Sequence, residues 1–243
     1  MVRLRASFIV LTILFAAFFI VNNSSAQTIV NGGFETGDFQ GWTVFQQPGS
    51  AGNWFVYSGN SIPGLPSPPV GSFAASTQQT GPSSQVLFQD IFIPPGARAL
   101  CSVIVYYNNN DSAGFVIGPG LAFALSANQQ GRIDIISTDA DPFTTAAGVF
   151  LNIFQTLPGD PNQLGYTTLN FDLSPFAGDT VRFRAAEVDN LGEFNFAIDE
   201  LTCEGIVIPT GIPTLGEWGM MAMAGVLGIA GLLYARRKRA AAV

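Results

Sequence analysis

Carboxylates are the groups in this sequence that could do the most chemistry: the 243-residue chain holds seventeen Asp and Glu residues and no His. Without an imidazole, the chain has no Ser-His or Cys-His pair and no His-bearing metal centre. A glycoside hydrolase needs only two carboxylates, but no pair of acids here lies in a recognisable catalytic motif. We therefore expect no enzymatic activity, and a glycan-active hydrolase is the third-ranked interpretation of the function.

The basic residues lie mostly at the two ends of the chain. Residues 6–235 contain only four of them: Arg98, Arg132, Arg182 and Arg184. All seventeen acids fall in this same stretch, so its formal charge is 4 − 17 = −13. Such a charge excludes nucleic acid as a partner, because phosphate binding requires a basic surface. It favours solubility outside the cell or the binding of cations.

The two cysteines, Cys101 and Cys203, suggest a disulfide. An exported protein meets an oxidising compartment, and an even number of cysteines allows complete pairing. The bond would close a loop of about a hundred residues, worth about 4 kcal/mol in the chain-entropy model. Two buried free thiols are the alternative.

The N-terminus has the pattern of a secretory signal peptide over residues 1–26. Arg3 and Arg5 form its positive region, residues 8–21 are apolar, and small residues end the segment at Ala26. Cleavage there would leave Gln27 as the new N-terminus. An uncleaved membrane anchor is the alternative, but the apolar run is shorter than the roughly 20 residues that a spanning helix needs.

Short segments rich in β-branched and aromatic residues recur between Gly, Pro, Asn and Asp clusters, which predicts strands separated by turns. The predicted strands cover residues 42–45, 53–57, 85–93, 100–107, 121–127, 132–137, 149–155, 168–174, 180–188 and 194–203. No helical periodicity precedes Met220. We therefore predict an all-β domain over residues 27–206, an antiparallel β-sandwich of jelly-roll type.

The alternation of side chains predicts which face of each strand is buried. Val181, Phe183 and Ala185 share one side of their strand, and Arg182 and Arg184 share the other, which we expect to face solvent. In the final strand the apolar positions change parity after Ile198, which predicts a β-bulge near Asp199 and Glu200.

Two stretches at the ends of this domain carry a resemblance to known modules. "NGGFETGDFQGW" (31–42) and "LSPFAGDTVRFRAAEVDN" (173–190) with "FNFAIDEL" (194–201) resemble the opening and closing strands of carbohydrate-binding and galactose-binding-like jelly rolls. The resemblance implies a structural Ca²⁺ between the first and last strands, with Glu35 and Asp199 as its ligands. Ca²⁺ prefers six to eight oxygen ligands, which an acidic domain can supply. Solvated acids at strand ends are the alternative.

Glycan binding would require aromatic rings that stack on sugars and polar groups that bond to hydroxyls. Of the adjacent Tyr106 and Tyr107, one must point outward. Arg182 and Arg184, on the face expected to be solvated, are the candidate polar partners. A solvated sheet face without a ligand explains these arginines equally well.

The C-terminal segment predicts a sorting tail. Residues 207–217 form a Pro- and Gly-rich linker, and 218–235 are predicted to be a transmembrane helix containing sixteen uncharged residues, 220–235. Such a run spans about 24 Å, slightly less than the roughly 30 Å hydrocarbon core of a bilayer. Residues 236–243 form a basic cytoplasmic tail whose cations would stop transfer: Arg236, Arg237, Lys238 and Arg239.

The sequence "IPTLGEWG" followed by a helix and basic residues resembles the IPTL-CTERM protein-sorting signal of Gram-negative bacteria. The matching residues are Ile212, Pro213, Thr214, Leu215, Glu217, Trp218 and Gly219, and Gly216 stands where Ser is frequent. The resemblance implies recognition and cleavage by an exosortase-type membrane protease. It also implies an exported protein that is transiently anchored in the inner membrane and then reaches the cell surface or the extracellular space. A plain single-pass anchor is the alternative.

These observations predict an exported surface or matrix protein. The leading functional interpretation is a module for adhesion and glycan binding, with surface or matrix glycans as partners. A structural envelope or matrix protein without a small ligand is the second interpretation.

Overall fold

The structure, a computed structural model, describes residues 29–60, 62–79, 81–204 and 215–240. The predicted signal peptide, the sorting-motif residues 212–214, and the side chains of Leu215, Glu217, Trp218 and Gly219 lie outside the described part. The chain divides into two compact units, Met1–Ile206 and Val207–Val243. The first contains the β-domain and the second contains the C-terminal helix.

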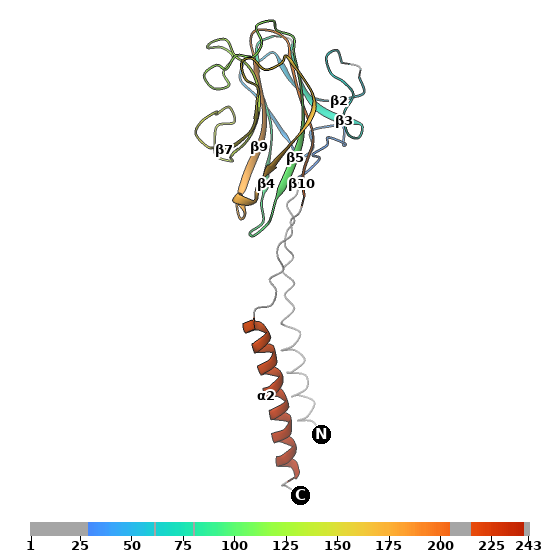
Figure 1. The fold of residues 1–243 in the computed structure, drawn as a ribbon, viewed down its shortest axis with the longest axis vertical. Helices are drawn as coiled ribbons and strands as arrows, with labels where there is room; N and C mark the ends of the chain where they lie inside the picture. The colour runs from blue at the N-terminus through green and yellow to red at the C-terminus, as the bar shows by residue number, and fades with distance from the viewer. Residues whose placement is uncertain (1–28, 61, 80, 205–214, 241–243) are drawn as a thin grey trace. The chain divides into compact units, whose positions relative to one another are not determined.

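The β-domain consists of two five-stranded antiparallel sheets (Figure 1). Sheet A has the order β1-β4-β9-β6-β7, with β1 (Thr43–Gln46), β4 (Ser83–Phe92), β9 (Thr180–Asp189), β6 (Gln129–Ser137) and β7 (Val149–Gln155). Sheet B has the order β2-β3-β10-β5-β8, with β2 (Gly52–Ser58), β3 (Phe73–Gln79), β10 (Phe194–Glu204), β5 (Leu100–Asn109) and β8 (Gln163–Asp172). A short 3-10 helix, η1 (Ser174–Phe176), precedes β9. The predicted all-β sandwich is confirmed.

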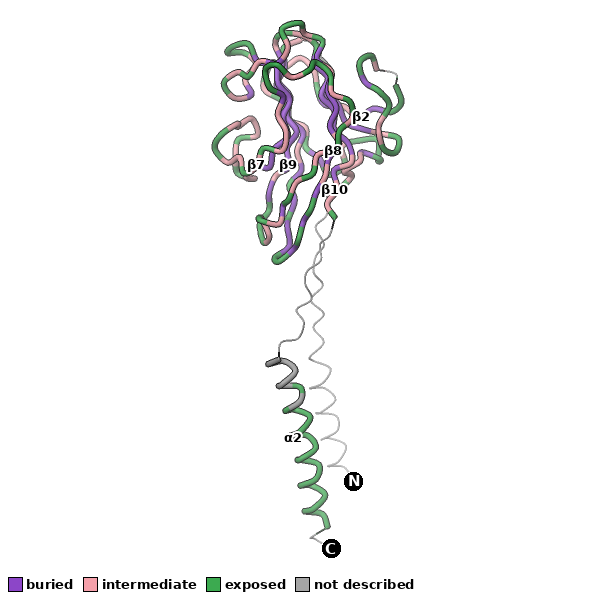
Figure 2. Tube along the Cα trace, viewed as in Figure 1, coloured by how far each residue is buried: buried purple, intermediate pink, exposed green. Residues whose placement is uncertain are grey.

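The core lies between the two sheets and is formed by alternate residues of each strand. Val181, Phe183 and Ala185 of β9 are fully or almost fully buried in it, as predicted, and Val105 and Phe196 belong to the same cluster from sheet B. Figure 2 shows buried positions concentrated along the strands and exposed positions in the connecting loops. Truncation of a ring such as Phe183 to Ala would cost about 3–5 kcal/mol of stability.

The predicted strands overlap strands of the structure except in two places, and β8 begins at Gln163, five residues before its predicted start. Residues 121–127 form no strand; Leu121 instead packs on Val86, Ala186 and Val188 outside sheet A, so its hydrophobicity serves to cover a sheet face. Strand β3 was not predicted, because its Ser, Thr, Ala and Gln residues give only a weak strand signal.

The end of β10 confirms two predictions. Its register against β5 shifts between Asp199 and Thr202, and Glu200 has φ = +50°, so the expected bulge is present. Beyond the bulge, Cys203 lies directly opposite Cys101, and the two form a disulfide.

The second unit contains α2 (Leu215–Ala240), which confirms the predicted C-terminal helix. Arg237, Lys238 and Arg239 lie in its last turn, where cations interact favourably with the free carbonyl groups. The prediction that residues 218–235 cross a membrane needs correction. Within the part of the chain that the structure describes, no helix combines the length and the apolar character needed to span one.

Candidate functional site

Two cavities of similar size lie at opposite ends of β10. The first, here called the apical pocket, has a volume of about 430 Å³ and is lined by Gly81, Pro82, Asp189, Asn190, Leu191, Gly192 and Glu193. These residues belong to the β3–β4 and β9–β10 turns, which both cross from one sheet to the other. A volume of this size falls in the range of small-molecule sites.

Hydrogen bonds to a neighbouring loop and from strand β6 fix the shape of the β9–β10 turn. The Asn190 side-chain amide donates to the carbonyls of Phe123 and Ser126, at 2.5 and 2.6 Å. The Gln129 side-chain amide donates to the carbonyl of Gly192 at 3.0 Å. A β-carbon at Gly192 would lie 2.8 Å from the Asp111 side chain, so the close approach there requires glycine. The pocket wall is therefore preformed.

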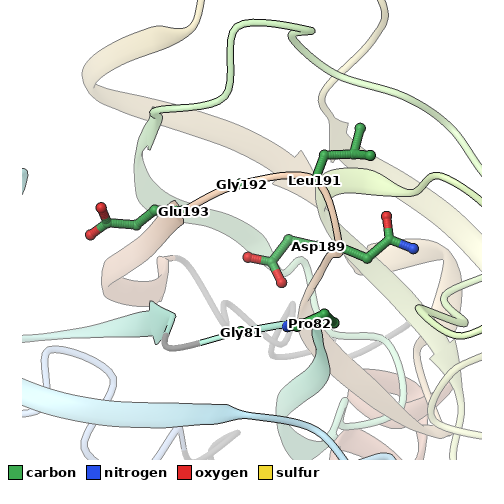
Figure 3. Close-up of a pocket in the computed structure, with 7 residues that line it drawn as sticks. Gly81, Pro82, Asp189, Leu191, Gly192 and Glu193 are labelled. Atoms are coloured by element: carbon green, nitrogen blue, oxygen red, sulfur yellow. The ribbon is translucent and has the colours of Figure 1, made fainter.

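Two carboxylates, of Asp189 and Glu193, belong to the lining of the apical pocket. Asp189 is 1% exposed and projects under the turn toward Gly81 and Pro82 (Figure 3). Ser83 pairs with Asp189 across the β4–β9 ladder, so the two side chains point to the same side of sheet A. The Ser83 hydroxyl is fully buried, and no hydrogen-bond partner for it lies in the described part of the chain.

Glu193, at the other end of the turn, is exposed at the pocket rim. One of its carboxylate oxygens accepts a hydrogen bond from the Asn110 side-chain amide at 3.2 Å. The lining residues include no cation. The pocket therefore offers mainly hydrogen-bond acceptors, which suit hydroxyl or ammonium groups of a ligand.

The second cavity, here called the basal cleft, has a volume of about 420 Å³ and is lined by Ile29, Gly32, Gly33, Glu35, Glu200, Leu201, Thr202 and Cys203. The opening "NGGF" turn shapes it. Asn31 and Phe34 have φ values of +53° and +58°, and the indole of Trp42 donates to the Asn31 carbonyl at 3.0 Å. Leu201 N donates to the Gly32 carbonyl at 3.0 Å, and a β-carbon on Gly32 would collide with the Leu201 carbonyl.

The predicted metal ligands, Glu35 and Asp199, meet at this cleft. Glu35 Oε1 accepts hydrogen bonds from the backbone N–H groups of Ser72 and Phe73, at 2.9 and 3.0 Å. Asp199 is 1% exposed; its Oδ1 accepts from Glu200 N at 2.7 Å, and its Oδ2 has no hydrogen-bond partner in the described structure. Glu35 therefore ties the opening turn to the start of β3.

The pKa of Asp199 is raised to about 7. Burial is the main cause, because it disfavours the charged form, and the Glu200 and Glu35 carboxylates add like-charge repulsion. Backbone N–H groups of Glu200 and Val70 act in the opposite direction. A carboxylate in this position lacks compensating positive charge.

The cleft fits an oxygen-coordinated cation only in part. A β-carbon at Gly33 would lie 2.9 Å from Glu200 Oε2 and 3.8 Å from Asp199 Oδ1, so the absent side chain leaves room beside two carboxylates. Among the described residues, however, no group of three or more His, Cys, Asp or Glu side chains is arranged to hold a metal ion. Ca²⁺ would need backbone carbonyls and water to complete its coordination here.

The predicted glycan-contacting tyrosines are both buried, at 2% and 3% exposure. Tyr107 lies in the core. Tyr106 points outward from sheet B, as one of the pair had to, but its hydroxyl donates to the Gly64 carbonyl at 2.6 Å. Tyr57 and Tyr166 lie beside it, with their hydroxyls 2.5 Å apart, and Tyr166 also donates to the Pro66 carbonyl at 3.2 Å. These tyrosines hold the segment around residues 64–66 against the sheet.

The expectation that the two arginines share a solvated face is wrong for Arg184, which is fully buried. Arg184 and Arg132 both pair with Asp134, and Arg184 also donates to the carbonyls of Pro142 and Thr144 at 2.7 Å. The loop that contains Pro142 covers this part of sheet A and excludes water from the charges.

Arg182 forms a bidentate ion pair with Asp90, at 2.6 and 2.9 Å, and lies 4.1 Å from the ring centroid of Phe88. The two arginines belong to sheet A, and Tyr106 and Tyr107 belong to sheet B. The structure therefore does not bring the four predicted ligand-binding residues together.

Sequence reasoning missed the apical pocket. The sequence did contain a sign of it in β9. Inward-facing residues alternate along this strand, and Glu187 and Asp189 continue the series of Val181, Phe183 and Ala185. Both acids are buried. A carboxylate at an inward position next to a Gly-containing turn can indicate a polar cavity at the end of a sandwich.

Comparisons with solved structures found proteins of low similarity. TmCBM61 in complex with β-1,4-galactotriose has 13% identity and a TM-score of 0.44, with 74% of this chain and 99% of that chain covered. A cleaved adhesin domain of Lys-gingipain from Porphyromonas gingivalis has 13% identity and a TM-score of 0.45, with the same coverage. The C-terminal family 22 carbohydrate-binding module of Clostridium thermocellum Xyn10B has 14% identity and a TM-score of 0.38, again with 74% and 99% covered. Likenesses of this size carry no argument about a ligand.

A match to a family model concerns the C-terminal segment alone. No curated protein matches the chain. Residues 210–239 match the IPTL-CTERM motif, which implies a secreted, surface-sorted protein and a substrate of a sorting enzyme. The chain thus ends in an IPTL-CTERM motif.

Proposed function

We propose that this protein is a non-catalytic glycan-binding module that is exported and sorted to the cell surface. The observation that carries the glycan-binding part is the apical pocket, a preformed cavity of about 430 Å³. Its lining includes the exposed carboxylate of Glu193 and the backbone of the β9–β10 turn, which can accept hydrogen bonds from the hydroxyls of a sugar ring. The rigid turns that form it reduce the ordering that binding would require.

Binding of the purified full chain to a glycan array tests this function. We expect a restricted set of glycans to be retained, and we expect Asp189→Asn to reduce their retention. Asp179→Asn is the matched control, because it removes the same charge from an exposed position just before β9, at the far end of the strand from Asp189. Retention of no glycan would favour the second interpretation, a structural envelope or matrix protein.

The sorting part of the proposal rests on the motif at residues 210–239. An exosortase-type membrane protease is the proposed partner, and the envelope of a Gram-negative bacterium is the proposed setting. Mass spectrometry of C-terminal peptides from surface-localised protein tests this step. We expect mature protein that lacks residues 232–243; mature protein that retains them would contradict processing at the motif.

A structural Ca²⁺ ion in the basal cleft is also part of the proposal. Glu35 and Asp199 would hold it, and the unbonded, buried Oδ2 of Asp199 is the observation that supports it. Bound Ca²⁺ would supply the positive charge that this carboxylate lacks. It would link the opening turn to β10 and so act on stability, with no part in glycan contact.

A further inference from the structure

Four phenylalanines gather on the outer face of sheet A, near its β1 edge. Phe45 of β1 pairs with Val86 of β4, and its ring centroid lies 5.6 Å from that of Phe143. Three half-buried rings pack against the cluster that contains Val86: Phe88, Phe123 and Phe143. Phe45 is 49% exposed. These four phenylalanines are here called the aromatic platform.

An ion pair borders the platform on strands β4 and β9. Asp90 follows Phe88 by two residues and so points to the same side of sheet A, and Arg182 pairs with Asp90 across the ladder. The Arg182 guanidinium lies 4.1 Å from the ring centroid of Phe88 and donates two hydrogen bonds to the Asp90 carboxylate. The Asp90 side chain is 41% exposed. Its oxygens can therefore accept further hydrogen bonds from a ligand.

This face is much less negative than the rest of the sandwich. Residues 29–204 contain 17 − 1 = 16 acids, since Glu217 lies outside them, and four arginines, for a formal charge of 4 − 16 = −12. The outward positions of sheet A and the covering loop 138–148 hold three of these arginines and four of these acids: Arg132, Arg182, Arg184, Asp90, Asp134, Asp139 and Asp141. Their formal charge is 3 − 4 = −1. The face therefore complements an uncharged ligand, whereas the domain as a whole repels an anionic one.

Exposed rings beside hydrogen-bonding groups suit a neutral sugar chain. A pyranose with equatorial hydroxyls presents axial C–H bonds on its two faces, and these apolar faces can cover aromatic rings and remove them from water. The hydroxyls lie at the edge of the sugar, where a carboxylate can accept hydrogen bonds from them. The platform and the Arg182–Asp90 pair supply both kinds of contact on one face.

We propose that the aromatic platform, with Arg182 and Asp90, binds a neutral glycan chain of β-linked pyranoses. The proposal rests on the proposed glycan-binding function and adds a second contact surface to the apical pocket. Phe45 and Phe143 would stack on one sugar, and Asp90 would accept hydrogen bonds from the hydroxyls of another. Rings that are already held by packing lose little conformational freedom on binding.

Calorimetric titration of the full chain with two matched hexasaccharides tests this inference. The first is cellohexaose, a chain of β-1,4-linked glucose, and the second has the same backbone with glucuronate in place of glucose. We expect cellohexaose to bind at least about tenfold more tightly, which corresponds to about 1.4 kcal/mol, because the uronate carboxylates would meet Asp90 and the acidic domain. Equal affinities, or no binding of cellohexaose, would overturn the proposal.

Two phenylalanine variants locate the binding. Phe45→Ala removes the most exposed ring of the platform, and we expect it to weaken cellohexaose binding about tenfold. Phe150→Ala is the matched control: Phe150 is 52% exposed, belongs to the opposite edge strand of sheet A, and has its ring centroid 5.5 Å from that of Phe176. The control should keep the wild-type affinity. Equal losses in the two variants would show general apolar contact and would overturn the site.

A third variant keeps the test decisive if Phe45→Ala perturbs the fold. Asp90→Asn preserves the shape of an exposed side chain and removes its charge, so it should retain the fold and weaken cellohexaose binding severalfold. An unchanged affinity would contradict the role of the ion pair. Sedimentation of the glycan-free protein checks another occupant, a second copy of the chain. Self-association that Phe45→Ala abolishes would overturn the glycan assignment.

The outcomes separate this inference from the broader function. If cellohexaose binds wild type and Phe45→Ala equally, the platform is not the site. A glycan on the array whose retention depends on Asp189 would then still support the glycan-binding function. If the array retains no glycan and cellohexaose does not bind, both proposals fail.

Discussion

The apical pocket and the basal cleft are nearly equal in volume and are both lined by carboxylates, yet their acids are engaged in different ways. In the basal cleft, Glu35 accepts backbone hydrogen bonds from Ser72 and Phe73, and the buried Asp199 accepts one from Glu200. In the apical pocket, Glu193 is exposed at the rim and bonds to the side chain of Asn110.

This difference indicates that the acids of the basal cleft stabilise the fold, whereas the apical pocket can bind a ligand. Carboxylates bonded to the backbone of another segment hold that segment in place, so their loss should reduce stability. A rim carboxylate that bonds to one exposed side chain contributes little to stability and remains able to contact a ligand. Changes at the basal end should therefore alter stability and leave apical binding intact.

The largest expected effect comes from the disulfide, which forms one side of the basal cleft. Replacement of both Cys101 and Cys203 by Ser should lower the free energy of unfolding by about 4 kcal/mol, because the bond links residues 102 positions apart. Denaturant unfolding measures the loss. Binding at the apical pocket should persist in the folded variant. A loss below about 1 kcal/mol, or a selective loss of apical binding, would contradict the division between the two cavities.

Calcium should have the next largest effect. With Ca²⁺ at about a hundred times its dissociation constant, linkage predicts a stabilisation of about 2.7 kcal/mol. Thermal unfolding with Ca²⁺ and with chelator measures it. Asp199→Asn should remove most of the response, and Glu193→Gln should retain it. If the wild-type melting temperature does not change with chelation, Ca²⁺ has no structural role in the cleft.

The β-strands were predictable from sequence where local pattern and tertiary role agree. Strand β9 alternates clearly, and the change of parity after Ile198 predicted the bulge near Asp199 and Glu200. The pattern failed at residues 121–127, where apolar side chains cover the outside of sheet A. Strand β3 was not predicted, because its conformation is determined by its place between β2 and β10 and not by its composition.

The site was less predictable, because it depends on contacts between segments that are distant in sequence. The resemblance to jelly-roll modules suggested Glu35 and Asp199. Both lie beside Gly33, a residue that lines the basal cleft. The alternation that grouped Arg182 with Arg184 could not reveal that a loop covers Arg184 and leaves Arg182 less enclosed. The apical pocket joins two turns about a hundred residues apart, and no local motif marks that meeting.

Taken per pH unit, the smallest expected effect is a dependence of stability on pH from Asp199. Its pKa is about 7 in the folded protein, against 3.8 as the ordinary value. Between these values, metal-free folded protein holds a proton that the unfolded chain has released, so the free energy of unfolding should fall as pH rises. The slope from this one group is at most about 1.4 kcal/mol per pH unit.

The titration of Asp134 should not obscure this slope. Burial would raise the pKa of Asp134, but Arg132 and Arg184 outweigh burial and hold that pKa below 3.8. Asp134 therefore titrates below the pH range in which the slope from Asp199 is measured. Denaturant unfolding in chelator at several pH values measures the slope, which Asp199→Asn should reduce and Asp179→Asn should preserve. Equal slopes in the wild type and Asp199→Asn would show that Asp199 titrates at its ordinary pKa, and burial of its carboxylate at the basal cleft would then have no effect on stability in this pH range.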